Sequence, residues 1–336
     1  MNAPAFGAFI LGCAGERITP QEARLFADAR PFGFILFDRN LREVSQIRAL
    51  CDELRQAAGH DAPIFIDQEG GRVQRLRPPL ACEWIPPLEE AERFGTLAAR
   101  ALELRHLIIA LELRGLGIDG NCVPCLDIAH PDTHPVLRNR CLGSDVQRVI
   151  ELGHAVIRGT QRGGVLPVIK HMPGHGRATL DSHLDLPLVD ASPELLEGHD
   201  FAPFRALADM PLAMSAHLVF EQIDPSPATL SPPIISLIRS KIGFDGLLMS
   251  DDISMNALCG PVHERSAAAL AAGCDVVLHC NGDLAEMQAI AQTCGIMSQK
   301  AQARAVRALA FRQTPPPLDI ASLRAEFEQM TANLTA

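Results

Sequence analysis

Long hydrophobic runs are missing from this chain of 336 residues. No apolar run reaches the roughly 18 residues that a membrane-spanning helix requires, so we expect no membrane partner. The apolar stretch at residues 5–12 has no basic residue before it, which is unlike the charged start of a secretory signal peptide. We therefore interpret this stretch as a first buried strand and expect a cytoplasmic protein.

Clusters of lysine and arginine are missing as well, and the formal net charge is −10. A protein that binds nucleic acid normally carries a basic patch, so nucleic acid is excluded as an expected partner. The ten cysteines are scattered, and several lie inside apolar runs, which is typical of buried free thiols. Together with the missing export signal, this pattern favours a reducing compartment.

Motifs typical of several other enzyme classes are also missing. The chain has no H-E-x-x-H, no P-loop and no G-x-S-x-G, and residues 12–15 do not match the G-x-G-x-x-G of dinucleotide-binding proteins. His171 and His175 are four residues apart, but Pro173 and Gly174 lie between them, so they cannot form a helical metal-binding pair. We expect neither a metal ion nor a cofactor.

Short apolar runs alternate along the chain with stretches of helical periodicity. The expected strands are residues 5–12, 33–37, 63–67, 121–128, 165–169, 212–219, 247–250 and 275–279. The expected helical regions are residues 21–30, 41–58, 88–116, 146–162, 194–208, 231–242, 264–272 and 284–311. This number and order of elements favour an α/β fold, a (β/α)8 TIM-type barrel.

The barrel is expected to form one catalytic domain over residues 1–336, because no change in composition marks a second domain. Residues 315–336 begin with three prolines and are interpreted as a C-terminal tail packed on the outside of the barrel. The alternative is a doubly wound open sheet, which usually carries a glycine-rich phosphate loop after its first strand. Residues 12–15 do not form such a loop.

Polar side chains follow the ends of several predicted strands. Asp67 ends the third strand, Lys170 and His171 follow the fifth, and Asp251 and Asp252 end the seventh. In a TIM-type barrel the carboxyl ends of the strands meet on one rim, where the active site lies. A carboxylate facing a second acid–base group is the arrangement that glycoside hydrolysis requires.

Four motifs on this rim resemble those of glycoside hydrolase family 3. They are DQEGGRVQR at 67–75, KHMPGHG at 170–176, DSH at 181–183 and SDD at 250–252, in that order. The combination of KH-x-PGHG with a downstream DSH is the most specific signal, and the similarity extends from about residue 5 to 281. Within this family the chain resembles the single-domain bacterial β-N-acetylglucosaminidases of peptidoglycan recycling.

The resemblance implies a retaining mechanism with three catalytic residues. The first carboxylate of SDD, Asp251, matches the nucleophile, while His183 matches the acid–base group and Asp181 the carboxylate that orients it. Residues two apart in an extended segment point to the same side, so Asp181 and His183 can form a pair. A carboxylate partner fixes the tautomer of a histidine whose pKa of about 6.5 suits proton transfer near neutral pH. We expect the 172–185 loop to be open without substrate and ordered when a sugar binds.

The resemblance also implies a set of substrate-binding residues, namely Asp67, Arg75, Arg140, Lys170 and His171. Two departures from the family pattern lie nearby: Met172 stands where phenylalanine is usual, and residues 141–142 are Cys-Leu instead of Ser-Phe. The implied substrate is a small carbohydrate, GlcNAc-1,6-anhydroMurNAc with or without its peptide, from which the enzyme releases terminal GlcNAc. We expect a monomer.

Two other functions remain open from the sequence. Phosphorolysis is one, because a neutral histidine repels incoming phosphate less than a carboxylate does. A non-catalytic sugar-binding protein is the other, and it would be expected to carry a broken DSH motif or to lack the nucleophile.

Several polar residues near the motifs also admit structural interpretations. Asp127 at the end of the fourth strand is interpreted as a cap of the following helix. Arg72 is interpreted as an ion-pair partner of Glu69 or Asp67. His175 is interpreted as a residue that holds its loop through hydrogen bonds to the backbone.

Overall fold

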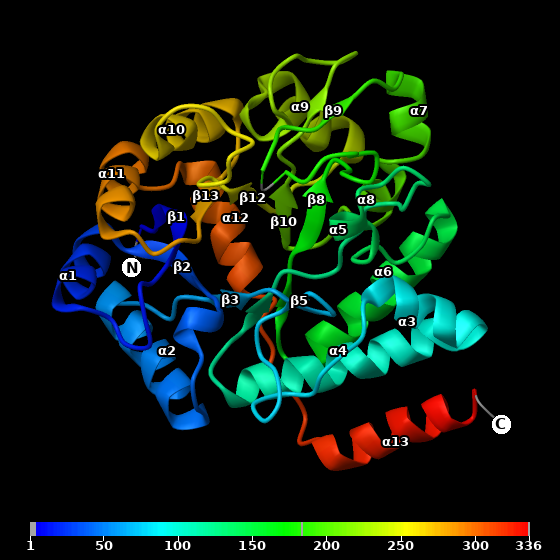
Figure 1. Ribbon diagram of the computed structural model, residues 1–336. Helices are drawn as coiled ribbons and strands as arrows, with labels where there is room; N and C mark the ends of the chain where they lie inside the picture. The colour runs from blue at the N-terminus through cyan, green and yellow to red at the C-terminus, as the bar shows by residue number, and fades with distance from the viewer. Residues whose placement is uncertain (1–4, 183, 335–336) are drawn as a thin grey trace.

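The computed structural model describes residues 5–182 and 184–334, and its centre is a ring of short parallel strands (Figure 1). The strands are β1 (Gly7–Gly12), β2 (Pro31–Leu36), β3 (Ile64–Ile66), β6 (Gly120–Asn121), β7 (Leu166–Pro167), β8 (Ile169–Met172), β10 (Leu212–Ser215), β12 (Leu247–Asp252) and β13 (Val276–His279). They pair in the order β7-β6-β3-β2-β1-β13-β12-β10-β8. His183, one of the predicted catalytic residues, lies outside the described residues.

The two ends of this order belong to one stretch of chain. Only Val168 separates β7 from β8, and β7 pairs with β6 on one side while β8 pairs with β10 on the other. The nine segments therefore act as eight strands, and the sheet closes on itself. This confirms the predicted (β/α)8 barrel, and the open doubly wound sheet is wrong.

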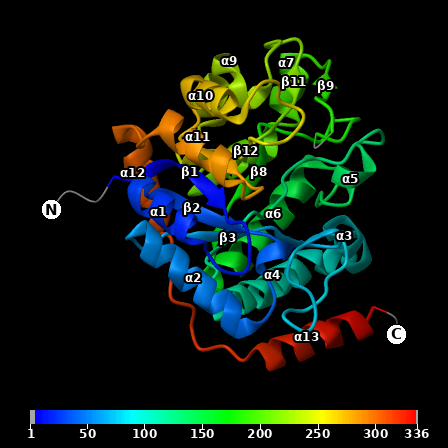
Figure 2. The ribbon, with the colours of Figure 1, turned by 60° about the vertical axis from the view of Figure 1, so that its left-hand side comes forward.

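Helices surround the barrel on its outside (Figures 1 and 2). They are α1 (Pro20–Ala29), α2 (Val44–Ala58), α3 (Pro87–Phe94), α4 (Ala98–Gly115), α5 (Pro135–Arg138), α6 (Val146–Arg162), α7 (Pro193–Gly198), α8 (Ala202–Ala206), α9 (Pro232–Leu237), α10 (Val262–Ala272), α11 (Leu284–Cys294), α12 (Gln299–Leu309) and α13 (Ile320–Ala332). Helix α2 shows how they attach, since its buried residues Ile47, Leu50, Leu54 and Ala58 recur every three or four positions. Such a stripe forms one apolar face, which packs against the strands.

Consecutive strand residues alternate between two hydrophobic clusters. In β1, Phe9 and Leu11 belong to the cluster shared with the surrounding helices, whereas Ala8 and Ile10 belong to a second cluster with residues from other strands. The same alternation separates Phe34 from Ile35 in β2. Because successive side chains of a strand point to opposite faces, the second cluster fills the interior of the barrel.

The fourth strand is shorter than the sequence predicts. Residues 121–128 were expected to be a strand, but β6 ends at Asn121. The chain beyond it carries Pro124, which has no N–H to donate to a ladder. It still runs beside β8, because Lys170 N–H donates to the Pro124 carbonyl (3.1 Å) and Leu126 N–H donates to the Lys170 carbonyl (2.7 Å).

Three predicted helical regions are each divided in two. Residues 88–116 form α3 and α4, separated at Gly95, whose positive φ of 53° ends α3. Residues 194–208 form α7 and α8, and residues 284–311 form α11 and α12. The second piece of the last region, α12, contributes Ala301, Ala305 and Ala308 to the same hydrophobic cluster as Ala8 and Ile10 of β1.

Two small sheets lie outside the barrel. The hairpin of β4 (Gln68–Gly70) and β5 (Val73–Gln74) is antiparallel and directly follows β3. The strands β9 (Leu188–Val189) and β11 (Val219–Phe220) pair in parallel. The first of these sheets carries part of the candidate site.

The C-terminal helix α13 lies on the outside along α4 and α3 (Figures 1 and 2). Its Phe327 ring packs edge-on against Trp84 with a centroid distance of 5.0 Å and contacts Phe94 at 5.5 Å. Among residues 5–182 and 184–334, no helix combines the length and the apolar content needed to cross a bilayer.

Candidate active site

The carboxyl ends of the barrel strands surround one cavity of about 200 Å³. It lies where β3, β8 and β12 deliver Asp67, Lys170, His171 and Asp251 to the same rim. Its lining includes seven of the eight predicted site residues, namely Asp67, Arg75, Arg140, Lys170, His171, Asp181 and Asp251. The eighth, His183, lies outside the described residues.

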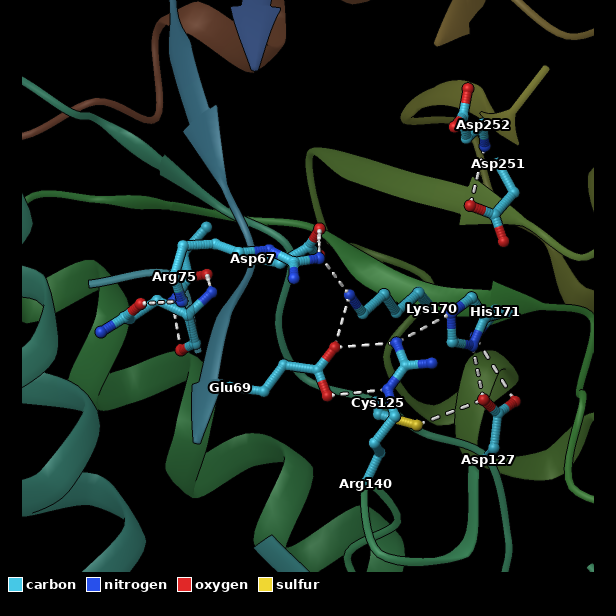
Figure 3. A network of polar contacts seen from close by, with 12 residues as sticks. Asp67, Glu69, Arg75, Cys125, Asp127, Arg140, Lys170, His171, Asp251 and Asp252 are labelled. Atoms are coloured by element: carbon cyan, nitrogen blue, oxygen red, sulfur yellow. Dashed lines mark hydrogen bonds and ion pairs between the residues drawn. The ribbon is translucent and has the colours of Figure 1, made fainter. Parts of the chain in front are cut away.

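Glu69 is the centre of a buried charge cluster at the base of this cavity (Figure 3). Its Oε1 lies 2.6 Å from Lys170 Nζ, and its two carboxylate oxygens accept hydrogen bonds from Arg140 Nη2 (2.8 Å) and Nε (3.0 Å). Burial opposes ionisation of Glu69, but Arg140 and Lys170 outweigh it and hold the pKa of this carboxyl well below its usual range. The carboxylate therefore fixes the two cations side by side.

Asp67 extends this cluster toward the cavity. Lys170 Nζ donates to its Oδ1 at 2.8 Å, and Arg75 Nη2 lies 3.5 Å from its Oδ2. Burial raises the pKa of Asp67, but the charges of Lys170 and Arg75 lower it by more. For Lys170, burial opposes the charged form, yet Asp67 and Glu69 raise its pKa above the ordinary value. Asp67 and Lys170 are thus both charged near neutral pH.

His171 is held by Asp127 rather than by the Lys170 cluster. Its Nδ1–H donates to Asp127 Oδ2 at 2.6 Å, and Arg140 Nη2 approaches its Nε2 at 3.3 Å. The fully buried Asp127 also accepts the backbone N–H of His175 at 2.6 Å. Burial opposes its ionisation, but His171 lowers the pKa of Asp127 well below its usual range. The interpretation of Asp127 as a helix cap is therefore wrong, because its carboxylate orients His171.

His175 also differs from the prediction. Neither ring nitrogen has a hydrogen-bond partner among the described residues, so the ring does not hold the loop to the backbone. Its backbone N–H makes the contact with Asp127 instead, and the ring packs edge-on against His171 with a centroid distance of 5.6 Å. Burial first, and then the neighbouring His171, lower the pKa of His175 to about 4. Its imidazole is therefore neutral at neutral pH.

Asp251 and Asp252 lie at the end of β12, across the cavity from Lys170 and His171 (Figure 3). The Asp252 carboxylate accepts hydrogen bonds from the Ser254 hydroxyl at 2.8 and 2.9 Å and from the Cys280 N–H at 3.2 Å. Asp252 N–H in turn donates to Asp251 Oδ1 at 2.8 Å. Asp252 therefore fixes the chain after β12 and orients its neighbour.

The loop after β8 brings Asp181 to the cavity rim. The first half of this loop is firmly attached. A Cβ at Gly176 would lie 2.0 Å from the carbonyl oxygen of Ile128, so only glycine permits this close approach. Arg177 Nε donates to Asp200 Oδ2 at 2.9 Å, and His134 N–H donates to the Ala178 carbonyl at 2.9 Å.

Arg72 does not pair with Glu69 or Asp67, so that prediction is wrong. It lies in the turn between β4 and β5, where its exposed side chain lines the cavity, while Glu69 is buried with Arg140 and Lys170. Glu69 is two residues from Asp67, and both carboxylates contact Lys170 instead of Arg72.

Two groups of described residues have the donor atoms for a metal ion within 4.8 Å of one another. They are Cys125, Asp127 and His171, and His130, His199 and Asp200. In the first group the Asp127–His171 hydrogen bond already uses one donor atom of each residue. In the second, the Asp200 carboxylate already pairs with Arg177.

Comparison with known proteins identifies the class of enzyme to which this site belongs. Residues 11–310 match the glycosyl hydrolase family 3 N-terminal domain. The chain therefore belongs to glycoside hydrolase family 3, as the motifs predict.

Curated relatives and solved structures narrow this class. The chain is 37% identical over 283 residues to a β-hexosaminidase of Alkalilimnicola ehrlichii, covering 82% of this chain and 81% of that one. It is 29% identical to NagZ of Neisseria gonorrhoeae in complex with N-trifluoroacetyl-D-glucosamine, with a TM-score of 0.83 over 99% of this chain and 98% of that one. A family 3 β-N-acetylglucosaminidase from Paenibacillus is 30% identical, with a TM-score of 0.83 over 96% of this chain and 67% of that one. The protein is thus a family 3 glycoside hydrolase of the β-hexosaminidase, NagZ-like type.

Proposed function

We propose that this enzyme is a retaining exo-β-N-acetylglucosaminidase that releases terminal GlcNAc from GlcNAc-1,6-anhydroMurNAc, with or without peptide. The observation that carries this proposal is the placement of Asp251 across one small cavity from the Asp67–Lys170–Arg140 cluster. Its volume of about 200 Å³ lies below the range of about 300–1,000 Å³ that is common for larger ligands. A single sugar ring is the fitting occupant, which favours exo action.

The charge cluster supplies the groups that a sugar needs. Asp67 is an ionised acceptor for vicinal hydroxyls, while Lys170 and Arg140 are donors whose positions Glu69 fixes. His171 presents its Nε2 side to the cavity because Asp127 holds its Nδ1. Charge-assisted hydrogen bonds of this kind are stronger than neutral ones, so the ring is held in one orientation.

In the proposed reaction, a carboxylate oxygen of Asp251 attacks the anomeric carbon as the bond to the leaving oxygen breaks. His183 gives its proton to that oxygen, and Asp181 stabilises the imidazolium before this transfer. Water then attacks the glycosyl-enzyme and loses a proton to His183, which restores the enzyme and retains the β configuration. The match to the SDD motif assigns the nucleophile to Asp251, while the Ser254 hydroxyl and the Cys280 N–H hold the Asp252 carboxylate in place.

The amino-sugar preference draws support from the relatives, which are named β-hexosaminidase or are bound to N-trifluoroacetyl-D-glucosamine. We rest three further parts of the proposal on the same likeness. They are the anhydromuramyl leaving group, a place in peptidoglycan recycling and a cytoplasmic location.

The test uses a chromogenic β-GlcNAc substrate with the matching β-glucoside as a control. The wild type is expected to cleave the first and to release the β anomer first, as followed by proton NMR. A 5-fluoro glycosyl substrate is expected to label the peptide that contains Asp251, as read by mass spectrometry. Preferential cleavage of the glucoside, release of the α anomer or a label on Asp252 would each contradict the proposal. Formation of sugar 1-phosphate in phosphate buffer would identify a phosphorylase instead.

A further inference from the structure

Two histidines and an aspartate meet beside the loop that follows β8. They are His130, His199 and Asp200, and none of the three lines the catalytic cavity. One potential ligand atom of each residue lies within 4.8 Å of those of the other two. Two imidazole nitrogens and one carboxylate oxygen are a donor set that suits a divalent transition-metal ion such as Zn²⁺.

The distances between these donors agree with a tetrahedral metal site. His130 Nε2 lies 3.3 Å from Asp200 Oδ1, and His199 Nδ1 lies 3.4 Å from Asp200 Oδ2. Nitrogen and oxygen ligands bind Zn²⁺ at about 2.0–2.1 Å, so two corners of the tetrahedron are about 3.3–3.4 Å apart. Each imidazole therefore already stands at the distance from the carboxylate that a shared Zn²⁺ ion requires.

The exposure of the three side chains gives an ion a way in. The His130 and His199 side chains are 20% and 30% exposed, whereas Asp200 is buried. His199 Nδ1 is itself buried and makes no hydrogen bond among residues 5–182 and 184–334, although a carboxylate oxygen is 3.4 Å away. An unpaired buried nitrogen is unfavourable, and coordination of a metal ion removes this cost.

Asp200 is ionised and fixed in place before any metal binds. Arg177 Nε donates to its Oδ2 at 2.9 Å. Burial opposes its ionisation, but hydrogen bonds from His130 and Arg177 outweigh burial and lower the pKa of Asp200. Oδ1 can bind a metal ion while Arg177 stays on Oδ2, and carboxylates that bind metals are commonly oriented by a hydrogen bond of this kind.

The surrounding charges restrict the class of metal. Two arginines contact the cluster, since Arg177 pairs with Asp200 and Arg138 donates to the His130 carbonyl. A single carboxylate beside two cations is a poor site for Mg²⁺ or Ca²⁺, which depend on several oxygen ligands. Imidazole nitrogens instead bind Zn²⁺ and the related transition-metal ions.

We propose that His130, His199 and Asp200 bind one Zn²⁺ ion, with a water molecule as the fourth ligand. The ion takes no part in the proposed glycosidase reaction, and the site does not depend on that reaction. It joins the segment before α5, which carries His130, to the segment after α7, which carries His199 and Asp200.

Both of these segments hold the loop that leads to Asp181. Asp200 binds it through Arg177, and the segment before α5 binds it through His134 N–H, which donates to the Ala178 carbonyl at 2.9 Å. A Cβ at Gly174, at the start of the loop, would lie 2.9 Å from the Asp200 carbonyl oxygen. A Zn²⁺ ion at this cluster therefore strengthens the attachment of the loop.

Equilibrium dialysis of the full-length, reduced protein against zinc chloride tests the proposal. His199→Gln removes one ligand, whereas the matched control His263→Gln removes a half-buried histidine of α10 that lies outside the cluster. Loss of a hydrogen bond to a metal ligand already weakens binding about 10–100-fold, so His199→Gln should weaken the binding of one zinc equivalent at least about tenfold. His263→Gln should leave it unchanged. Equal zinc binding by the wild type and His199→Gln would overturn the proposal.

Cobalt identifies the ligands by spectroscopy. The first equivalent of Co²⁺ is expected to give the visible absorption of a tetrahedral ion without the near-ultraviolet band of a cobalt–thiolate bond. A thiolate band in that first equivalent would place the ion on cysteines and overturn the proposal, as would its displacement by excess Mg²⁺. His130→Gln should abolish the same visible absorption, which keeps the test decisive if His199→Gln does not fold. All of these readouts are independent of glycosidase activity.

Discussion

Replacing Glu69 by glutamine tests the idea that this residue holds the charge cluster together. The substitution keeps the shape of the side chain but removes its negative charge. Lys170 would retain Asp67 as a partner at 2.8 Å. Arg140 would lose the carboxylate that now accepts two of its hydrogen bonds, at 2.8 and 3.0 Å, and its guanidinium would stay largely buried.

The size of the effect follows from these distances. Two unit charges about 2.7 Å apart attract by roughly 6 kcal/mol at an effective dielectric constant of about 20. The cost of burying the charges offsets part of this attraction in the wild type, whereas the variant leaves a buried cation with less compensation. Breaking a buried pair on one side costs about 3–5 kcal/mol, and we expect Glu69→Gln to lower the free energy of unfolding by that amount.

Urea unfolding at pH 7, followed by circular dichroism, measures this change. The matched control is Glu151→Gln, whose carboxylate lies 3.0 Å from Arg148 on α6 and is 53% exposed. Exposed or half-exposed pairs contribute little, so the control should lose less than about 1 kcal/mol. A loss in Glu69→Gln no larger than that of the control would refute the reasoning.

Three further predictions concern the other parts of the candidate site. Asp127→Asn weakens the hydrogen bond that orients His171. We expect it to reduce kcat/KM on the chromogenic substrate by about 10–100-fold, which corresponds to the loss of one hydrogen bond to a charged group. An unchanged kcat/KM would contradict this. The pKa values of Glu69 and Asp127 are lowered in the folded protein, so the two carboxylates stabilise the fold at pH values above their unfolded pKa values of 4.5 and 3.8. This stabilisation is lost as the pH falls below those values. Urea unfolding from pH 6 to pH 3 should show a falling free energy of unfolding, with a smaller fall in Glu69→Gln. Gly176→Ala places a Cβ 2.0 Å from a main-chain carbonyl oxygen and is expected to lower both stability and activity. Gly198→Ala, with open space around its Cβ, is expected to lower neither. Equal effects of the two substitutions on urea unfolding and on kcat/KM would argue against a tightly packed loop.

The barrel was predictable because its strands are buried on both sides. Runs such as residues 33–37 and 276–278 are apolar throughout, and helical stretches separate the runs. Where a local signal was lacking, the prediction was incomplete. The division of the fifth strand at Val168 depends on the neighbours that each half pairs with, and a hydrophobic run contains no information on pairing.

The candidate site was also predictable only in part. Asp67, Lys170 and Asp251 were located because strand ends meet on one rim. The partnership of Glu69 with Arg140 joins residues 71 positions apart, and that of Asp127 with His171 joins residues 44 positions apart. Neither pair has a sequence spacing that reveals it, and for Glu69 the nearby opposite charge of Arg72 was a poor guide to the true partner.

The two carboxylates of the DQE segment meet different requirements of a site that buries cations. A sugar needs donors that stay in place, and the donors that we propose are the buried Lys170 and the largely buried Arg140. Two buried cations require two negative charges nearby. Asp67 provides one and still lines the cavity, whereas Glu69 provides the other from beneath, where it contacts both cations. If this division is right, Asp67→Asn should reduce activity far more than stability, because Lys170 keeps Glu69 as a partner at 2.6 Å and the proposed substrate contact of Asp67 is lost. Glu69→Gln should reduce both together.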